Sequence, residues 1–334
     1  MVYYKLLFTL TLMIGSLISI SSYSWFSMWI GLEINLLSII PIISSTSNSF
    51  KSESALKYFV VQAMASMILL MSIILMSNIN QFIFSKMSLT IMINSTLLTK
   101  MGAAPFHFWF PEIMEGLSWN NSIIMLTWQK LAPMILLIYN NFTIFFLTII
   151  IIFNMIISGI MGLNQTSLRK IMAYSSINHM GWMISIILFN NSLWFIYYII
   201  YSLITINMIL IFKHLNSLYL KQLFTSMNNN YIKLFFLINF LSLGGLPPFL
   251  GFLPKWLTIL SLTENNLIFI PTMMTIMTLM TLYMYLRIIF NSLIMSNNEI
   301  NFIMFYPKLN NTLMTYNYLI IMSLIFCTMI FNYL

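Results

Sequence analysis

Three lysines lie in stretches that are otherwise apolar enough to cross a lipid bilayer: Lys100, Lys130 and Lys255. A lysine at the centre of a membrane helix costs about 2.5–3.5 kcal/mol on insertion scales. Lys100 directly precedes a stretch that contains glycine and proline, and Lys255 directly follows Pro254. A chain that keeps three such cations at membrane depth, two of them beside helix breaks, is predicted to use them to handle charge. The pattern indicates movement of ions or protons rather than catalysis on a soluble substrate.

Two other titratable residues share this setting, Glu33 in the second apolar stretch and His179 in the middle of a later one. Burial favours the neutral form of an amine, and a nearby carboxylate favours its charged form. An imidazole titrates near neutral pH without such help. A row of these groups joined by water can therefore pass protons from one to the next.

Each of these residues also has a structural interpretation. A lysine near a helix end can extend its amine to the membrane interface, which applies to Lys255 more than to Lys130. Glu33 can be a purely structural partner of a lysine, and His179 can be a hydrogen-bonded core residue. His107, which follows the first break, is interpreted as a packing or capping residue.

The composition defines the class of the chain. Hydrophobic residues make up 60% and charged residues 6% of the 334 residues, and the mean hydropathy is +0.93. Because a soluble domain carries about 25% charged residues, we predict an all-α polytopic membrane protein. The formal net charge of +8 comes from basic residues spread singly along the chain, so we expect no nucleic acid as a partner.

The sequence contains no motif for a metal or a redox cofactor. Cys327 is the only cysteine, and His107, His179 and His214 lie in three separate segments. This excludes a disulfide within the chain and a CxxC metal site. Neither a GxGxxG, a P-loop nor an HExxH motif is present. We therefore expect this chain to bind no cofactor itself.

Hydropathy and the polar, glycine and proline interruptions predict about eleven transmembrane helices. The predicted spans are residues 5–23, 25–43, 55–77, 82–110, 120–139, 142–163, 168–189, 192–212, 231–261, 266–290 and 313–332. The fourth and ninth are long and broken, the fourth by Gly102–Pro105 and the ninth by Gly244–Pro248. Residues 1–12 run almost directly into the first span without a recognisable transit peptide, so we expect insertion without a removable segment.

The two broken spans lie five spans apart, which indicates an internal repeat. Residues 5–139 and 142–290 are then two five-helix repeats, and residues 313–332 add one C-terminal helix, all within a single membrane domain of residues 1–334. Because five is odd, the repeats have opposite orientations, as in many transporters. A proline inside a span frees a carbonyl that must face protein or water, so two broken spans predict two hydrated half-paths.

Loop charge predicts the orientation of the chain. With eleven spans, the basic residues on the side of the N-terminus are Lys5, Lys51, Lys57, Arg169, Lys170, Lys213, Lys221, Lys233, Arg287 and Lys308. The opposite side carries essentially Lys86 alone. The positive-inside rule therefore places the N-terminus on the inner face and the C-terminus on the outer face.

Six motifs carry a resemblance to a known family. They are WIGLEINL (29–36), KMGAAPFHFWFP (100–111), TWQKLAP (127–133), LNQTSLR (163–169), AYSSINHMGWM (173–183) and LGGLPPFLGFLPKW (243–256). In this order they resemble the mitochondrial NADH dehydrogenase subunit 2 family, and its insect members in particular. These proteins are antiporter-like subunits in the membrane arm of respiratory complex I.

The resemblance implies a proton-translocating subunit driven by electron transfer in other subunits. It implies that Glu33 pairs with Lys100, that Lys130 is the central relay lysine, and that Lys255 exchanges protons with the far side. It also places His179 on a polar central axis. The hypothesised path runs from the N-terminal face through Lys100 and Lys130 towards Lys255.

The resemblance also implies the surroundings of the chain. NADH, FMN, iron–sulfur clusters and ubiquinone would bind elsewhere in the complex. The expected partners are other membrane-arm subunits, namely NADH dehydrogenase subunits 4 and 4L with accessory subunits, and membrane lipids such as cardiolipin. The expected location is the mitochondrial inner membrane, with the N-terminus in the matrix and the C-terminus on the intermembrane-space side.

Two other functions remain open from the sequence. The chain can be a stand-alone cation/proton antiporter, which would exchange Na⁺ for H⁺ without other subunits. It can also be a structural spacer whose buried charges only hold helices together, in which case charge-neutral substitutions would damage assembly but not proton stoichiometry.

Overall fold

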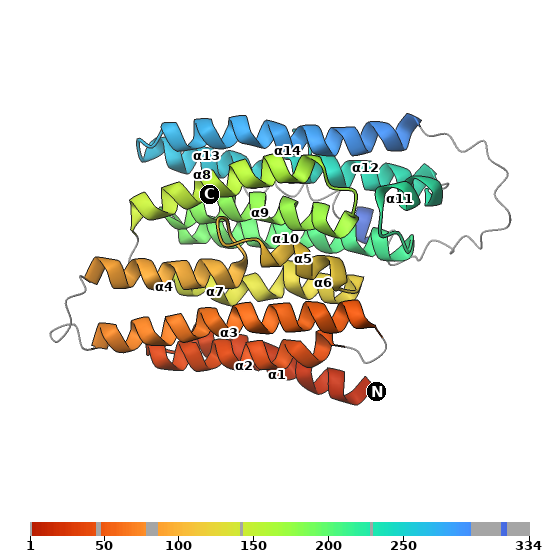
Figure 1. The fold of residues 1–334 in the computed structure, drawn as a ribbon. Coiled ribbons are helices and arrows are strands. Elements are labelled where there is room, and N and C mark those ends of the chain that lie inside the picture. Colours follow the sequence, from red (N-terminus) through yellow and green to blue (C-terminus); the bar gives the residue numbers. More distant parts are fainter. Residues whose placement is uncertain are drawn as a thin grey trace. The chain divides into compact units, whose positions relative to one another are not determined.

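The computed structural model describes residues 2–44, 48–77, 86–140, 143–227, 230–294 and 315–318. Within these ranges the fold is helical (Figure 1), and the only bridge of β type joins Ser167 to Tyr219. The chain divides into two compact units, Met1–Asn154 and Met155–Leu334, whose boundary falls inside one long helix. The predicted all-α class is confirmed.

Unit 1 contains seven helices and the first half of an eighth. They are α1 (Val2–Ser21), α2 (Trp25–Ile43), α3 (Ser49–Ser77), α4 (Lys86–Met101), α5 (Trp109–Gly116), α6 (Trp119–Leu126), α7 (Trp128–Tyr139) and α8 (Ile144–Leu163). Helices α1, α2 and α3 run side by side, coloured red to orange in Figure 1. Helices α4 and α5, which flank the first interruption, both pack against α3.

Unit 2 contains the second half of α8 and six further helices. They are α9 (Leu168–Ile187), α10 (Asn191–His214), α11 (Leu220–Ser226), α12 (Asn230–Gly244), α13 (Phe252–Glu264) and α14 (Phe269–Ile294). Helices α12 and α13, which flank the second interruption, both pack against α10 and α14. Helix α9 packs against α10, α13 and α14.

Seven segments in the described ranges are helical, long and apolar enough to cross a membrane. They are Tyr3–Ser21, Trp25–Ile43, Ser49–Ser77, Trp119–Tyr139, Ile144–Leu163, Asn191–His214 and Phe269–Ile294. Of the other predicted spans, 231–261 is divided between α12 and α13, and 168–189 corresponds to α9. The span 82–110 contains α4, the interruption and only the first two residues of α5, and its residues 82–85 lie outside the described residues. The last predicted span, 313–332, lies outside the described residues apart from 315–318. The chain is thus a multi-pass helical membrane protein.

Helix α4 ends in a glycine-terminated motif inside the fourth predicted span. Gly102 has a φ of +74°, in the region that glycine adopts without a steric penalty. Its N–H donates to the Thr99 carbonyl, and the Ala103 N–H donates to the Leu98 carbonyl, both at 3.1 Å. These are the two hydrogen bonds of a Schellman motif, so the last turn of α4 is closed within itself.

Helix α12 ends in the same way. Gly245 also has a φ of +74°. Its N–H donates to the Ser242 carbonyl at 3.0 Å, and the Leu246 N–H donates to the Leu241 carbonyl at 3.3 Å. The two interruptions therefore share the same backbone hydrogen-bond pattern.

One interruption was not predicted from the sequence. The predicted span 120–139 is divided at Thr127, whose φ and ψ of −111° and −78° depart from helical values. Its hydroxyl donates to the Ile123 carbonyl at 2.7 Å. Farther on, Pro133 has no N–H, so the Gln129 carbonyl lacks its usual helical donor. The segment that carries Lys130 lies between these two irregularities.

Helices α1 and α2 approach closely at two glycines, Gly15 and Gly31. A Cβ built on Gly31 would lie 2.5 Å from the Ser19 backbone nitrogen and 2.8 Å from the Gly15 carbonyl oxygen. Small residues allow such close backbone packing between membrane helices. This contact fixes α2, which carries Glu33, against α1.

Replacing Gly31 by alanine should force α1 and α2 apart, because the new methyl group would meet backbone atoms that cannot rotate away. Overpacking costs typically about 1–3 kcal/mol, so we expect a lower thermal unfolding temperature of the purified protein. Gly162→Ala is the matched control, because its Cβ would come closest to the flexible Met284 sulfur, at 3.0 Å. Equal unfolding temperatures for the two variants would contradict this account of the contact.

Candidate functional site

Lys100 lies in the last turn of α4 and is 7% exposed. The carbonyls at this helix end are taken by neutral donors from neighbouring helices. Gln62 Nε2 on α3 donates to the Lys100 carbonyl at 3.3 Å, and Trp109 Nε1 donates to the Thr99 carbonyl at 3.2 Å. The amine of Lys100 is therefore not needed to satisfy its own helix end.

Glu33 is half-buried on α2, and its Oε1 is buried with no hydrogen-bond partner among the described residues. The carboxylate interacts electrostatically with Lys100 on α4 and with Tyr58 on α3. In the part of the chain that the structure describes, Glu33 and Lys100 form no direct ion pair. Unit 1 thus brings the predicted acid and the predicted lysine into electrostatic range without joining them.

Lys130 is fully buried on α7, with 1% of its surface exposed. Its amine lies 5.3 Å from the ring centroid of Phe110 on α5. An aromatic face attracts a cation at this distance. The central lysine therefore contacts the half-helix that follows the first interruption.

The backbone of the first interruption is held by a residue that sequence reasoning missed. Asn154 Oδ1, on α8, accepts a hydrogen bond from the Ala104 N–H at 2.7 Å, and this side chain is fully buried. Its signal in the sequence is a single amide within a long apolar run (IIIIFNMII). Such an amide needs a partner in a membrane, but the run does not reveal which one.

Lys255 lies on α13, 6% exposed, beside the second interruption. Its Nζ donates to the carbonyls of Gly244 at 2.8 Å and Leu243 at 3.3 Å. Both carbonyls belong to the end of α12, where the helix dipole favours a positive charge. The amine also lies 5.9 Å from the ring centroid of Trp182 on α9.

His179 lies on the same helix as Trp182, one turn before it. Its Nδ1 is hydrogen-bonded to the hydroxyl of Tyr197 at 2.9 Å, and its ring packs against the rings of Tyr197 and Tyr201. Helix α9 therefore carries both a buried imidazole and the aromatic ring beside Lys255. The two predicted residues of unit 2 are thus linked through α9, which carries His179 and contacts Lys255 through Trp182.

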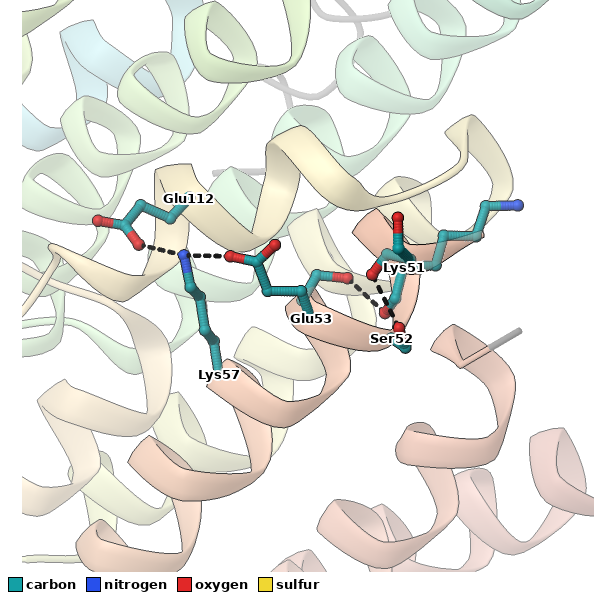
Figure 2. A network of polar contacts seen from close by, with 7 residues as sticks. Lys51, Ser52, Glu53, Lys57 and Glu112 are labelled. Carbon is teal, nitrogen blue, oxygen red and sulfur yellow. Dashed lines mark hydrogen bonds and ion pairs between the residues drawn. The ribbon is translucent and has the colours of Figure 1, made fainter. Parts of the chain in front are cut away.

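A second group of charges lies at the surface of unit 1. Figure 2 shows the amine of Lys57 between two carboxylates, Glu53 at 3.1 Å and Glu112 at 3.0 Å. All three side chains are more than two-fifths exposed, and exposed pairs contribute little to stability. This group links α3 to α5 but is not part of the buried set. Within the described ranges no three His, Cys, Asp or Glu side chains gather as metal ligands.

A family model and curated relatives indicate the same family of proteins, and solved structures share its fold. A family model described as "NADH:quinone oxidoreductase/Mrp antiporter, TM" matches residues 22–281. The chain is 48% identical to NADH-ubiquinone oxidoreductase chain 2 of Anopheles gambiae, and also of Aedes aegypti, with 97% of each chain covered. It is similar in fold to a chain of respiratory complex I from Thermus thermophilus, with a TM-score of 0.80, 22% identity, and 87% of this chain and 70% of that chain covered.

Replacing Gly245 by alanine should displace the amine of Lys255. The new Cβ would lie 2.6 Å from Lys255 Cδ and 2.9 Å from Nζ, and a left-handed conformation costs an alanine about 1–2 kcal/mol. We expect a cryo-EM map of the purified variant to show the amine moved away from the Gly244 carbonyl.

The neighbouring Gly244→Ala is the control, because its Cβ would have only ordinary contacts, with nothing nearer than 3.6 Å. It should leave the lysine in place. If Gly245→Ala kept the 2.8 Å hydrogen bond, the glycine would not be what makes room for this amine.

Proposed function

Because this chain belongs to the NADH:quinone oxidoreductase/Mrp antiporter family, and within it to the chain 2 subunits of NADH:ubiquinone oxidoreductase, we propose that it moves protons through a relay of buried lysines. It is a subunit of respiratory complex I, and it belongs to an antiporter-like, proton-translocating family. The observation that supports the relay is the burial of three lysines in a multi-pass membrane protein: Lys130 within a candidate span, and Lys100 and Lys255 beside the two interruptions. A buried lysine in a membrane protein is energetically costly, so the lysines that such proteins retain usually have a function.

In the proposed relay, Glu33 biases Lys100. A carboxylate nearby favours the protonated amine, so Lys100 holds its proton when Glu33 is close and gives it up when the two separate. Glu33 and Lys100 interact electrostatically without forming an ion pair, as expected of two residues that move together and apart in the proposed relay. Lys130 then receives the proton as the central member of the path.

Lys255 is the proposed point of exchange with the far side. Its amine is held by two carbonyls at the end of α12, so a proton on it is stabilised by the helix dipole rather than by an acid. His179, one turn of α9 from the aromatic ring beside Lys255, is a further member of the proposed path. The path as a whole runs from the N-terminal face through Lys100 and Lys130 to Lys255.

We further propose that the fold is the one expected from the sequence, with eleven spans in two inverted five-helix repeats and one C-terminal helix. The matching hydrogen bonds and φ angles at Gly102 and Gly245 support the repeat. The proposed location is the mitochondrial inner membrane, with the N-terminus in the matrix. Subunits 4 and 4L, accessory subunits and cardiolipin are the proposed partners, and NADH oxidation and ubiquinone reduction take place in other subunits.

Two rival functions each have an observation in their favour. The family description includes Mrp antiporters, which favours a stand-alone cation/proton antiporter. The hydrogen bonds of Lys255 to a helix end favour a structural spacer. Exchange of Na⁺ for H⁺ by the chain alone in vesicles would support the first rival.

Replacing Lys130 or Lys255 by methionine should abolish the proton movement that depends on this chain. Methionine is apolar and flexible enough to occupy a similar space, but it cannot carry a proton. The measurement is the number of protons moved per NADH oxidised by the assembled complex in vesicles, beside rotenone-sensitive NADH:ubiquinone oxidation.

Lys213→Met, at an exposed position in the last turn of α10, is the control and should keep the full proton yield. A full yield in Lys130→Met and Lys255→Met would overturn the relay. If those variants also assembled poorly, the structural spacer would take its place.

A further inference from the structure

Two buried amides join α2 to α7 by a reciprocal pair of hydrogen bonds. Asn35 Nδ2 donates to Gln129 Oε1 at 3.2 Å, and Gln129 Nε2 donates to Asn35 Oδ1 at 2.9 Å. The hydroxyl of Tyr58, on α3, donates to the same Gln129 oxygen at 3.4 Å. None of the three residues is more than 8% exposed. Three helices therefore meet at one polar contact, here called the amide clamp (Asn35, Tyr58 and Gln129).

The amide clamp is costly to open. An amide that loses its partner in a buried site costs about 1–3 kcal/mol, and the bilayer supplies no water to replace that partner. Gln129 uses its oxygen twice and its nitrogen once within the clamp. Separating α2 from α7 would leave polar atoms on both helices unsatisfied, so the clamp holds these helices at a fixed distance.

The amide clamp lies in a segment whose helical hydrogen bonding is irregular. Gln129 is one residue before Lys130, between the interruption at Thr127 and Pro133. Because Pro133 cannot donate to the Gln129 carbonyl, the helix itself constrains this segment less than usual. The side chain of Gln129 supplies the constraint from a neighbouring helix instead.

The amide clamp also lies close to Glu33 and Lys130 along their helices. Asn35 follows Glu33 by two residues, about 3 Å along the helix axis, and Gln129 precedes Lys130 by about 1.5 Å. Tyr58, the third member, interacts electrostatically with Glu33. One contact therefore ties together the helix segments that carry the acid and the central lysine.

We propose that Asn35, Gln129 and Tyr58 are positioning residues that hold the Lys130 segment at a fixed distance from Glu33 and Lys100. This inference rests on the proposed relay. The two amides do not titrate, so their role is to fix geometry rather than to carry a proton. Without the clamp, the segment between Thr127 and Pro133 shifts and the passage of a proton to Lys130 fails.

The test uses the assembled complex in vesicles. Gln129→Leu and Asn35→Leu should each lower the number of protons moved per NADH, while NADH oxidation with an uncoupler present stays at the parental rate. The exchanged pair Asn35→Gln with Gln129→Asn keeps the combined length of the two side chains and should restore the proton yield. A role limited to stability predicts that the single variants already keep the full proton yield.

The matched control is another buried amide pair in unit 1. Asn140 Nδ2 donates to Asn94 Oδ1 at 2.8 Å, at a position six residues before Lys100 in α4. Asn94→Leu should lower thermal stability as Gln129→Leu does, yet keep the full proton yield. Equal losses of proton yield in these two variants would overturn the positioning role.

The outcomes separate this inference from the relay itself. If Lys130→Met abolishes proton movement while Gln129→Leu keeps the full yield, the clamp is refuted and the relay stands. If Lys130→Met keeps the full proton yield, the relay is refuted. A loss of proton yield in Gln129→Leu would then not act through Lys130, and the proposed positioning role would be refuted with the relay.

Discussion

A bilayer offers no water to the backbone groups at a helix end, and this constraint governs both interrupted helices. A helix that stops inside the membrane leaves its last carbonyls to be satisfied by protein. The glycine-terminated motifs at Gly102 and Gly245 satisfy part of them from the backbone. The remaining carbonyls need side-chain donors, and the choice of these donors determines where charge can reside.

The two units meet this demand with different chemistry. In unit 1 the donors are the neutral side chains of Gln62 and Trp109, so the amine of Lys100 is left to interact with Glu33. In unit 2 the donor is the amine of Lys255 itself. The charge of Lys255 therefore contributes to holding α12 and α13 together, whereas the charge of Lys100 does not have this structural role. A change in protonation has a different mechanical consequence in each unit.

The sequence predicted the features that are energetically costly in a membrane helix. Buried lysines and glycine–proline stretches are unfavourable in a membrane helix, so Lys130 and both interruptions could be recognised without a structure. The hydrogen-bond partners on neighbouring helices could not be recognised in this way. The donation from Lys255 to α12, the hold of Asn154 on Ala104 and the pairing of Asn35 with Gln129 depend on how helices pack. A hydropathy pattern also carries no record of an interruption such as that at Thr127, which has neither glycine nor proline beside it.

The likeness of the two interruptions does not extend to their side chains. When Gly102 is aligned with Gly245, Lys100 falls on Leu243 and Lys255 falls on Glu112. Glu112 is exposed and bound to Lys57, whereas Lys255 is buried. The same backbone motif thus has a lysine before the break in one unit and after it in the other. In the proposed relay, Lys100 therefore responds to the distance of a carboxylate, that of Glu33, whereas Lys255 responds to the two carbonyls at the end of α12.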